Sequence, residues 1–218
     1  MTSGMAATPQ RSTTPPQATH GEIVSQLREA AQLYGMLDEA YVAQIAQAGQ
    51  LLANALGQGR KLIWFGNGGS ATQSQHMAAE FIGRFKADRR SLPSISLTEN
   101  MASITAIGND YAFEQIFSRQ LEGLAQPGDV ALGLSTSGNS GNVLRGMRRA
   151  KELGVGTIGL TGGTGGQMRT LCDVCICVPS SITARIQEAH LTIGHILCSL
   201  VEDALSVYGT GAGAQPAR

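Results

Sequence analysis

Two ionisable side chains, His76 and Glu80, have the types and the spacing to transfer a proton or to hold a metal ion. They lie four residues apart, so on a helix they project from the same face. The same spacing also fits a solvated surface pair. Their position close behind a glycine-rich loop is what favours a functional role, as an acid–base pair or as part of a metal site.

A second set of such side chains follows near the other end of the chain, in Arg185-Ile-Gln-Glu-Ala-His190 and His195. At about 100° per residue, Glu188 and His195 nearly coincide around a helix, whereas Gln187 lies about 80° from His195. Spacing alone therefore pairs Glu188 with His195. It leaves His190 on another face, and a lone helical histidine is more often a packed or surface residue than a ligand.

Two short loops rich in glycine and hydroxyl groups could bind a phosphate. They are Gly66-Asn-Gly-Gly-Ser70 and Ser135-Thr-Ser-Gly-Asn-Ser140, and a helical segment follows each of them. Backbone N–H groups at a helix N-terminus attract a dianion, and the hydroxyls add further donors. Plain N-capping needs only one Ser or Asn, so four hydroxyls in six residues favour phosphate binding.

The first loop also has the form of a dinucleotide fingerprint, G-x-G-x-x-G/A, through Gly66, Gly68 and Ala71. The acidic residue of that fingerprint should follow about 20 residues later. The candidate here, Glu99, comes 31 residues after Gly68, which disfavours a nicotinamide cofactor. The serine loop matches neither the G-x-S-x-G nucleophile elbow nor the G-K-[S/T] of a P-loop.

The elements that position these loops are indicated by short apolar runs that alternate with helical periodicity, which is typical of βαβ units and a parallel sheet. Continuous apolarity in the third and fourth runs indicates burial on both faces. We therefore predict a doubly wound α/β fold: a five-stranded parallel sheet flanked by helices, with an N-terminal helical extension. Strands are expected at 61–65, 94–98, 130–134, 157–161 and 174–179, and helices at 21–57 (two, or one bent), 70–86, 100–123, 140–153, 165–171 and 183–207.

The composition excludes several classes of protein. The 16 basic and 16 acidic side chains cancel, which argues against a partner that is nucleic acid or an anionic membrane. No stretch approaches 18 consecutive apolar residues, so no membrane span is expected. We predict a single domain over residues 21–207. A disordered tail at 1–20, with three prolines and no acidic residue, and a flexible tail at 208–218 are expected to flank it.

Cys172, Cys175 and Cys177 form the remaining motif. The C-x-x-C spacing of the first two could begin a zinc or redox site. However, Asp173-Val-Cys-Ile-Cys-Val178 has the pattern of a buried strand in which Cys175 and Cys177 face the same way. Since free cysteine packs as a small hydrophobe and no second C-x-x-C completes a zinc set, we interpret these residues as core residues of a cytoplasmic protein.

Taken together, the motifs resemble the sugar isomerase (SIS) family, and within it the phosphoheptose isomerases, over roughly residues 21–207. The resemblance rests on five motifs in order: Gly66-Asn-Gly-Gly-Ser70, His76 with Glu80, Gly108-Asn-Asp110, Ser135-Thr-Ser-Gly-Asn-Ser140, and Arg185-Ile-Gln-Glu188 with His195.

The resemblance implies an isomerase that converts D-sedoheptulose 7-phosphate to D-glycero-D-manno-heptose 7-phosphate, the first step of nucleotide-activated heptose biosynthesis. It also implies a homotetramer whose sites combine more than one subunit, with one zinc ion per subunit. The implied zinc ligands are His76, Glu80, Gln187 and His195, so the resemblance, and not helix geometry, selects Gln187 over Glu188. Because glutamine is an unusual zinc ligand, partial occupancy or a different metal is compatible with this set.

By the same resemblance, the substrate contacts are spread along the chain. Isomerisation through an enediol needs a base, a second acid–base group and stabilisation of the developing oxyanion. We expect Glu80 as the base and His195 as the second group, because imidazole titrates near neutral pH. The implied sugar contacts are Asn67, Gly68, Gly69, Glu80, Asn109, Asp110 and Gln187, and the implied phosphate contacts are Ser135, Thr136, Ser137 and Ser140.

Two other functions are compatible with the same motifs. One is a non-catalytic tetrameric SIS protein that binds the replication initiator DnaA, and the other is a sugar-phosphate sensor. The intact set of His76, Glu80 and His195 favours an enzyme over a scaffold, which has no chemical need for it. Residues 1–60 contain no basic recognition helix, which disfavours a DNA-binding regulator.

Overall fold

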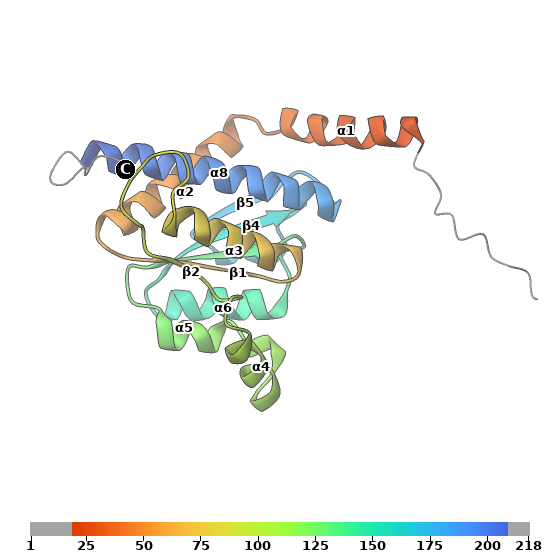
Figure 1. Cartoon of the computed structure of the whole chain (residues 1–218). Coiled ribbons are helices and arrows are strands. Elements are labelled where there is room, and N and C mark those ends of the chain that lie inside the picture. Colours follow the sequence, from red (N-terminus) through yellow and green to blue (C-terminus); the bar gives the residue numbers. More distant parts are fainter. Residues whose placement is uncertain (1–18, 209–218) are drawn as a thin grey trace, which may run out of the picture.

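The centre of the molecule is a sheet of five parallel strands in the order β2-β1-β3-β4-β5 (Figure 1). Because β2 and β3 pair with opposite edges of β1, the strand order reverses there, and the loops after β1 and β3 emerge side by side. The computed structural model describes residues 19–208. Its strands are β1 (Leu62–Gly66), β2 (Ser94–Ser96), β3 (Val130–Ser135), β4 (Gly156–Gly162) and β5 (Val174–Val178).

The burial of each strand follows its place in the sheet. β1 and β3 are buried at every residue, and β4 at every residue but its first, because helices cover both faces of the central strands. The edge strand β5 alternates between buried and half-buried residues. Val174 and Ile176 face one helical layer and Cys175 faces the other.

Two layers of helices enclose the sheet, which confirms the predicted doubly wound fold (Figure 1). Helices α2, α3 and α8 pack on one face around a core that contains Trp64. Helices α5, α6 and α7 cover the other face around Phe65 and Phe117. The helices are α1 (His20–Gly35), α2 (Glu39–Gly57), α3 (Gly69–Ile82), α4 (Met101–Asp110), the short 3-10 helix η1 (Phe113–Gln115), α5 (Ser118–Leu124), α6 (Gly141–Glu152), α7 (Met168–Leu171) and α8 (Thr183–Tyr208).

Three helix predictions were wrong in extent. The helix expected over 165–171 begins only at Met168, because Gly165 and Gly166 have φ of +83° and +52°. The helix expected over 70–86 ends at Ile82, because Gly83 has ψ −107° and leaves the helical region. Glycine is also a poor helix former. The helix expected over 100–123 is divided into α4, η1 and α5, with a break at Tyr111, whose φ and ψ are −125° and −86°.

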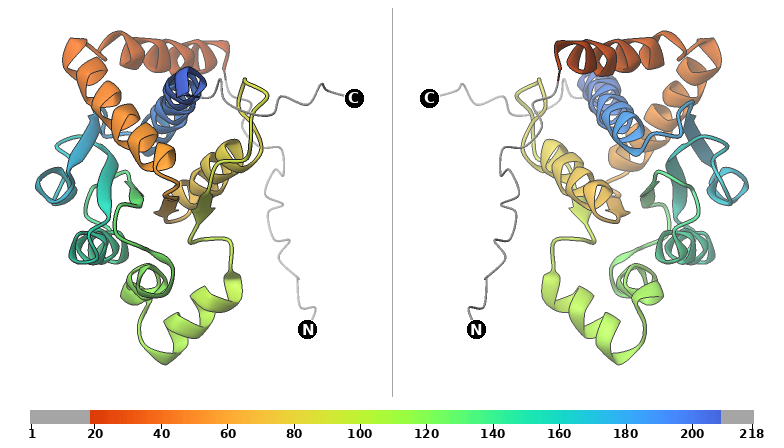
Figure 2. Two further views of the ribbon diagram at one scale, coloured as in Figure 1. Left: turned by 90° about the vertical axis from the view of Figure 1, so that its left-hand side faces the viewer. Right: turned by 90° about the vertical axis from the view of Figure 1, so that its right-hand side faces the viewer.

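The N-terminal extension consists of two helices, and α1 projects from the body at the opposite end from α4 (Figure 2). A capping box starts α1: Glu22 N–H donates to Thr19 Oγ1, and Thr19 N–H donates to the Glu22 carboxylate. The N-cap Thr19 and the first residue of α1, His20, therefore fall inside the tail expected at 1–20. The rest of that tail, 1–18, and residues 209–218 lie outside the described residues.

Among the described residues, no helix combines the length and the apolar character needed to cross a membrane.

Candidate active site

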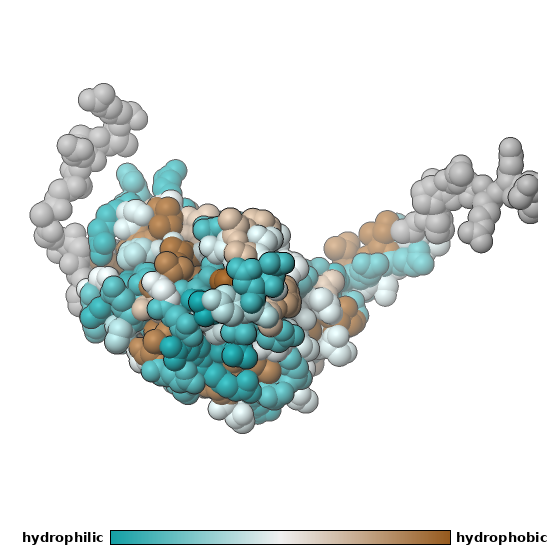
Figure 3. Space-filling model, turned by 90° about the horizontal axis from the view of Figure 1, so that it is seen from below, coloured by the Kyte–Doolittle hydropathy of each residue, from teal (hydrophilic) through white to brown (hydrophobic). Residues whose placement is uncertain are grey.

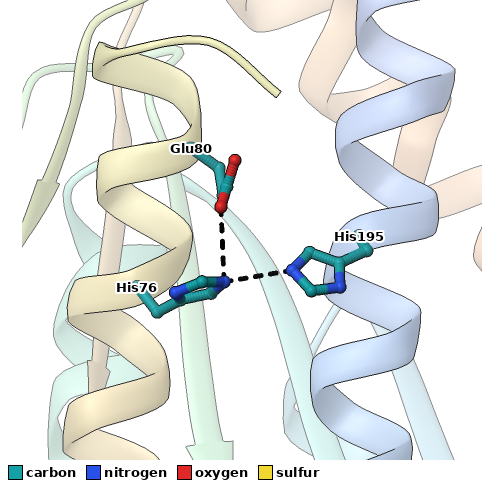
Figure 4. Close-up of side chains that lie close together, drawn as sticks. All are labelled: His76, Glu80 and His195. Carbon is teal, nitrogen blue, oxygen red and sulfur yellow. Dashed lines mark hydrogen bonds and ion pairs between the residues drawn. The ribbon is translucent and has the colours of Figure 1, made fainter. Parts of the chain in front are cut away.

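Three side chains on two neighbouring helices form a compact cluster (Figure 4). His76 and Glu80 project from α3, and His195 projects toward them from α8. His76 Nε2 lies 3.0 Å from His195 Nε2 and 3.3 Å from Glu80 Oε1. The three ligand atoms all lie within 4.8 Å of one another. We call His76, Glu80 and His195 the α3/α8 cluster.

Close packing of α3 against α8 brings this cluster together. His76 and Glu80 are one turn apart and share a face, as their spacing predicts. Across the helix interface, Gly194 lies against Met77, and a Cβ atom at residue 194 would overlap the Met77 Sδ atom. The missing side chain at Gly194 therefore allows α8 to approach α3 beside His76.

The cluster has the atoms and the access that acid–base or metal chemistry requires. Two imidazole Nε2 atoms at 3.0 Å either share one proton or direct two lone pairs toward a common cation. The side chains of His76 and Glu80 are 46% and 21% exposed, so a small ligand can reach them. The ring of Phe85 stacks on that of His195, with centroids 5.3 Å apart and an interplanar angle of 15°, which restrains the imidazole.

The glycine loop after β1 is fastened to the neighbouring serine loop by a pair of amides. Asn67 Nδ2 donates to Asn142 Oδ1, and Asn142 Nδ2 donates to Asn67 Oδ1, both at 2.8 Å. Asn142 is buried in the first turn of α6, directly after the serine loop. Gly68, with φ +54°, is the N-cap of α3 and makes no side-chain capping hydrogen bond. The N–H groups of Ser70 and Ala71 donate to the carbonyl oxygens of Asn67 and Gly68 instead.

The serine loop after β3 directs its hydroxyls away from simple capping. Ser140 is the N-cap of α6, but its side chain makes no capping hydrogen bond. Instead its Oγ lies 2.9 Å from that of Ser135. Gly138, with φ +66°, turns the loop where a Cβ would overlap the carbonyl oxygen of Gly165. Together with exposed Ser137, the loop offers hydroxyls and helix N–H groups to an anion.

Gln187, in the second turn of α8, contacts the start of α3 and does not belong to the α3/α8 cluster. Its Nε2 would be 2.5 Å from a Cβ at Gly69, so its amide rests on the glycine loop. Its backbone carbonyl accepts a hydrogen bond from Gln73 Nε2 at 2.6 Å. His195 is eight residues further along α8, which is a rise of about 12 Å.

Glu188 and His190, the other two α8 residues considered for the site, have partners outside the α3/α8 cluster. Glu188, which spacing alone pairs with His195, forms an ion pair with Arg185 at 2.5 Å. His190 is 1% exposed, and its Nε2 lies 3.0 Å from the carbonyl oxygen of Thr161. His190 is therefore a packed histidine, one of the two roles expected of a lone helical histidine that binds no ligand.

Asn109 and Asp110 lie in a third part of the molecule. They end α4, where both are exposed and Asn109 Nδ2 donates to Asp110 Oδ1 at 2.8 Å. α4 lies beyond the α5/α6 layer, on the other side of the sheet from α3 and α8 (Figure 1). Within one chain these two residues are thus separated from the α3/α8 cluster.

Three residues that shape these sites are absent from the sequence-based expectations. Phe85 stacks on His195, Asn142 pairs with Asn67, and Gly194 permits the contact between α3 and α8. Asn142 lies in the first turn of the helix that follows a loop of hydroxyls, so it is the one that its neighbourhood could have indicated. Phe85 and Gly194 belong to no motif, so spacing offers no signal for them.

Comparison with known proteins gives a consistent result. Residues 27–162 match the SIS domain family. The phosphoheptose isomerase of Aquifex aeolicus is 51% identical over 176 residues, covering 81% of this chain and 92% of that protein. The phosphoheptose isomerase of Geobacter sulfurreducens is 51% identical over 184 residues, covering 84% and 97%. The solved structure of phosphoheptose isomerase GmhA from Neisseria gonorrhoeae superposes with a TM-score of 0.80 at 36% identity, covering 84% of this chain and 98% of that one.

Proposed function

Because the chain belongs to the SIS family, and within it to the phosphoheptose isomerases, we propose that it interconverts D-sedoheptulose 7-phosphate and D-glycero-D-manno-heptose 7-phosphate. The observation that carries the proposal is one chain with an acid–base cluster, a glycine loop about 10 Å away along α3, and a serine loop beside that glycine loop. The reaction is the first step of nucleotide-activated heptose biosynthesis. The domain responsible would span 21–207, beyond the matched 27–162.

The distance between the loops and the cluster suits this substrate. The phosphate is on C7, whereas the bond that reacts joins C1 and C2 at the other end of the carbon chain. Ser135, Thr136, Ser137 and Ser140 bind the phosphate in this proposal, with help from the N-terminus of α6. The sugar contacts are Asn67, Gly68, Gly69, Glu80, Asn109, Asp110 and Gln187.

The chemistry is a proton transfer between neighbouring carbons. The Glu80 carboxylate removes a proton from C1 of the ketose to form the enediol and returns it to C2 to form the aldose. His195, with its ring held against Phe85, moves the hydroxyl proton between O1 and O2. Both residues reach the same small space, because His76, which contacts each of them, lies between them.

The donor set of the α3/α8 cluster fits a zinc ion. Two imidazole nitrogens and a carboxylate oxygen, all within 4.8 Å of one another, are ligands that catalytic zinc sites use. When bound, zinc would supply Lewis-acid polarisation of the substrate carbonyl oxygen. The resemblance implies Gln187 as the fourth ligand. In the single chain its amide rests on Gly69, about 12 Å of helix rise from His195, so it lies out of reach of an ion held by the other three residues. Glutamine is also a rare zinc ligand.

A homotetramer would reconcile the separated parts of the site. Asn109 and Asp110 end α4, on the other side of the sheet from the α3/α8 cluster. The projecting α1 carries apolar side chains on its surface (Figure 3), among them Ile23 and Leu27, which are 52% and 67% exposed. Assembly through such surfaces would bury apolar area and let α4 of one subunit complete the site of another.

The proposed enzyme acts in the cytoplasm on a phosphorylated sugar, with neither nucleic acid nor membrane as partner. In residues 19–208 all four cysteines are free thiols, which suits a reducing compartment. The initiator-binding scaffold and the sugar-phosphate sensor are less well supported. Identity of 51% to phosphoheptose isomerases, together with the α3/α8 cluster, favours catalysis.

A coupled assay for aldose formation from sedoheptulose 7-phosphate, with zinc-loaded protein, tests the proposal. We expect turnover by the parent and a loss of at least about 100-fold in Glu80→Gln, the scale of a general base. Glu152→Gln is the matched control, since Glu152 is a surface carboxylate that pairs with Arg149 on α6. A folded, metal-loaded parent without turnover would contradict the proposal.

A further inference from the structure

Glu202 on α8 is a buried carboxylate that the proposed reaction does not use, yet four donors converge on it. It is 6% exposed. It accepts hydrogen bonds from the backbone N–H groups of Phe85, Lys86 and Ala87 at 3.1, 3.0 and 2.9 Å. Arg89 Nε adds a fourth at 2.9 Å. Burial alone would raise the pKa of Glu202, but these hydrogen bonds and the charge of Arg89 hold the pKa below its usual value, so the group is an anion.

Arg89 connects this carboxylate to the end of α3. Its Nη2 donates to the carbonyl oxygen of Glu80 at 3.0 Å, and its Nη1 to that of Phe81 at 2.9 Å. These carbonyls belong to the last turn of α3, where backbone oxygens lack a helical partner. A cation is also favourable at a helix C-terminus. Arg89 therefore fixes the turn of α3 that carries Glu80.

The other end of the same segment reaches His195. Phe85 is held to Glu202 through its backbone N–H, while its ring stacks on His195. Glu202 and His195 are seven residues apart, so they share a face of α8 two turns apart. Lys86 Nζ adds a hydrogen bond of 3.2 Å to Ser199 Oγ, between them on the helix.

We infer that Glu202, together with Arg89, is a positioning residue for the isomerisation. The two residues fix the position of Glu80 relative to His195. Glu80 is held through the carbonyls at the end of α3, and His195 through the ring of Phe85. The inference rests on the proposed function, which gives Glu80 and His195 the proton transfers. A displacement of about 1 Å in such groups can cost about 100-fold in rate.

Glu202→Gln tests the inference, because it keeps the size of the side chain and removes the charge. We expect kcat to fall about 10- to 100-fold, whereas KM changes less than about 3-fold because the serine loop is untouched. We expect Arg89→Lys also to lower kcat, although it keeps the positive charge. Lysine lacks the planar fork that spans the carbonyl oxygens of Glu80 and Phe81.

Asp129→Asn is the matched control for a merely structural effect. Asp129 is also buried, accepts the N–H groups of Lys61 and Gln126, and pairs with Lys61 Nζ at 2.6 Å. It directly precedes the first residue of β3, at the amino ends of the strands, whereas the glycine and serine loops follow their carboxyl ends. We expect Asp129→Asn to lower thermal stability and to leave kcat unchanged.

A measurement without turnover separates the inference from the proposed function. Because the Phe85 ring stacks on His195, we expect its ring current to shift the His195 ring protons in an NMR spectrum. This shift should collapse in Glu202→Gln and in Phe85→Leu, and persist in Asp129→Asn. A folded Glu202→Gln protein with the parental kcat and His195 shift overturns the inference. A parent without turnover overturns the proposed function, while the His195 shift still decides whether Glu202 positions the ring.

Discussion

Two regions of the molecule carry side chains of the kind that bind metals and protons, in opposite surroundings. One is the α3/α8 cluster, whose side chains face one another and are reached by water. The other surrounds Thr161 of β4 and contains buried His190 with half-buried Cys175 and Cys177; we call it the Thr161 interior. His190 Nε2 meets the Thr161 carbonyl oxygen, and the two cysteine Sγ atoms lie 3.8 Å apart on one side of β5.

The surroundings keep the Thr161 interior uncharged. Burial lowers the pKa of His190 to about 4, although the hydrogen bond to the Thr161 carbonyl opposes this. Since a carbonyl only accepts, neutral His190 carries its proton on Nε2. Hydrogen bonding to Cys172, together with burial, raises the pKa of Cys175 to about 12, and hydrogen bonding to Cys175 and burial raise that of Cys177 as well. Ligand-type residues thus lie close together in both regions, but those of the Thr161 interior are held in their neutral forms.

The largest effect that would test this comparison is the acid sensitivity caused by His190. Its pKa is about 4 in the folded state and 6.5 as the reference, so as pH falls the unfolded chain binds the proton first. The contribution of His190 to the free energy of unfolding is therefore complete above about pH 6.5. It falls by about 3 kcal/mol as pH falls toward 4. Urea unfolding at several pH values should show this loss of unfolding free energy in the parent and not in His190→Leu. His20→Gln, which changes an exposed histidine, is the control and should behave like the parent. An equal slope in His190→Leu would contradict the prediction.

The second effect concerns the metal. His76→Ala removes one donor of the α3/α8 cluster and should lower zinc affinity more than about 100-fold, because losing even an outer-shell partner costs 10- to 100-fold. Cys175→Ser changes a ligand-type residue of the Thr161 interior and should leave the affinity unchanged. Competition titration against a chromogenic chelator measures both. The comparison is reversed if Cys175→Ser is the variant that loses zinc.

The smallest effect is the reactivity of the thiols. With its pKa raised from 9.0 to about 12, Cys175 has about 1,000-fold less thiolate at pH 8 than an unperturbed thiol. The higher nucleophilicity of a more basic thiolate recovers part of this, so alkylation should be slower by at least about 30-fold. Mass spectrometry after timed labelling with iodoacetamide gives the rate. Alkylation of Cys175 in the folded protein at the rate of a free peptide would contradict its assignment to the interior.

The sheet could be predicted from sequence because local composition decides it. The runs that became β1 and β3 are continuously apolar and bounded by turn residues, which is what burial on both faces requires. The end of α3 at Ile82 could not be predicted in the same way. The N–H groups beyond it are satisfied by Glu202, which lies 115 to 117 residues later in the chain.

For the candidate site too, contacts within one helix could be predicted from sequence, and contacts between helices could not. His76 and Glu80 were found from spacing, since one helix face determines their contact. The partnership of His195 with them entered only through the family resemblance, because 119 residues separate His195 from His76. Helix periodicity favoured Glu188, which pairs with Arg185 instead. A contact between two helices depends on features such as Gly194 that no local pattern reveals.

The pairing of α3 with α8 also sets when the α3/α8 cluster can exist during synthesis. All five strands are complete by Val178, and α8 begins at Thr183. A nascent chain that has already made the whole sheet still lacks His195, and domains fold as their segments leave the ribosome. The growing chain therefore lacks a complete α3/α8 cluster until α8 emerges and packs along α3.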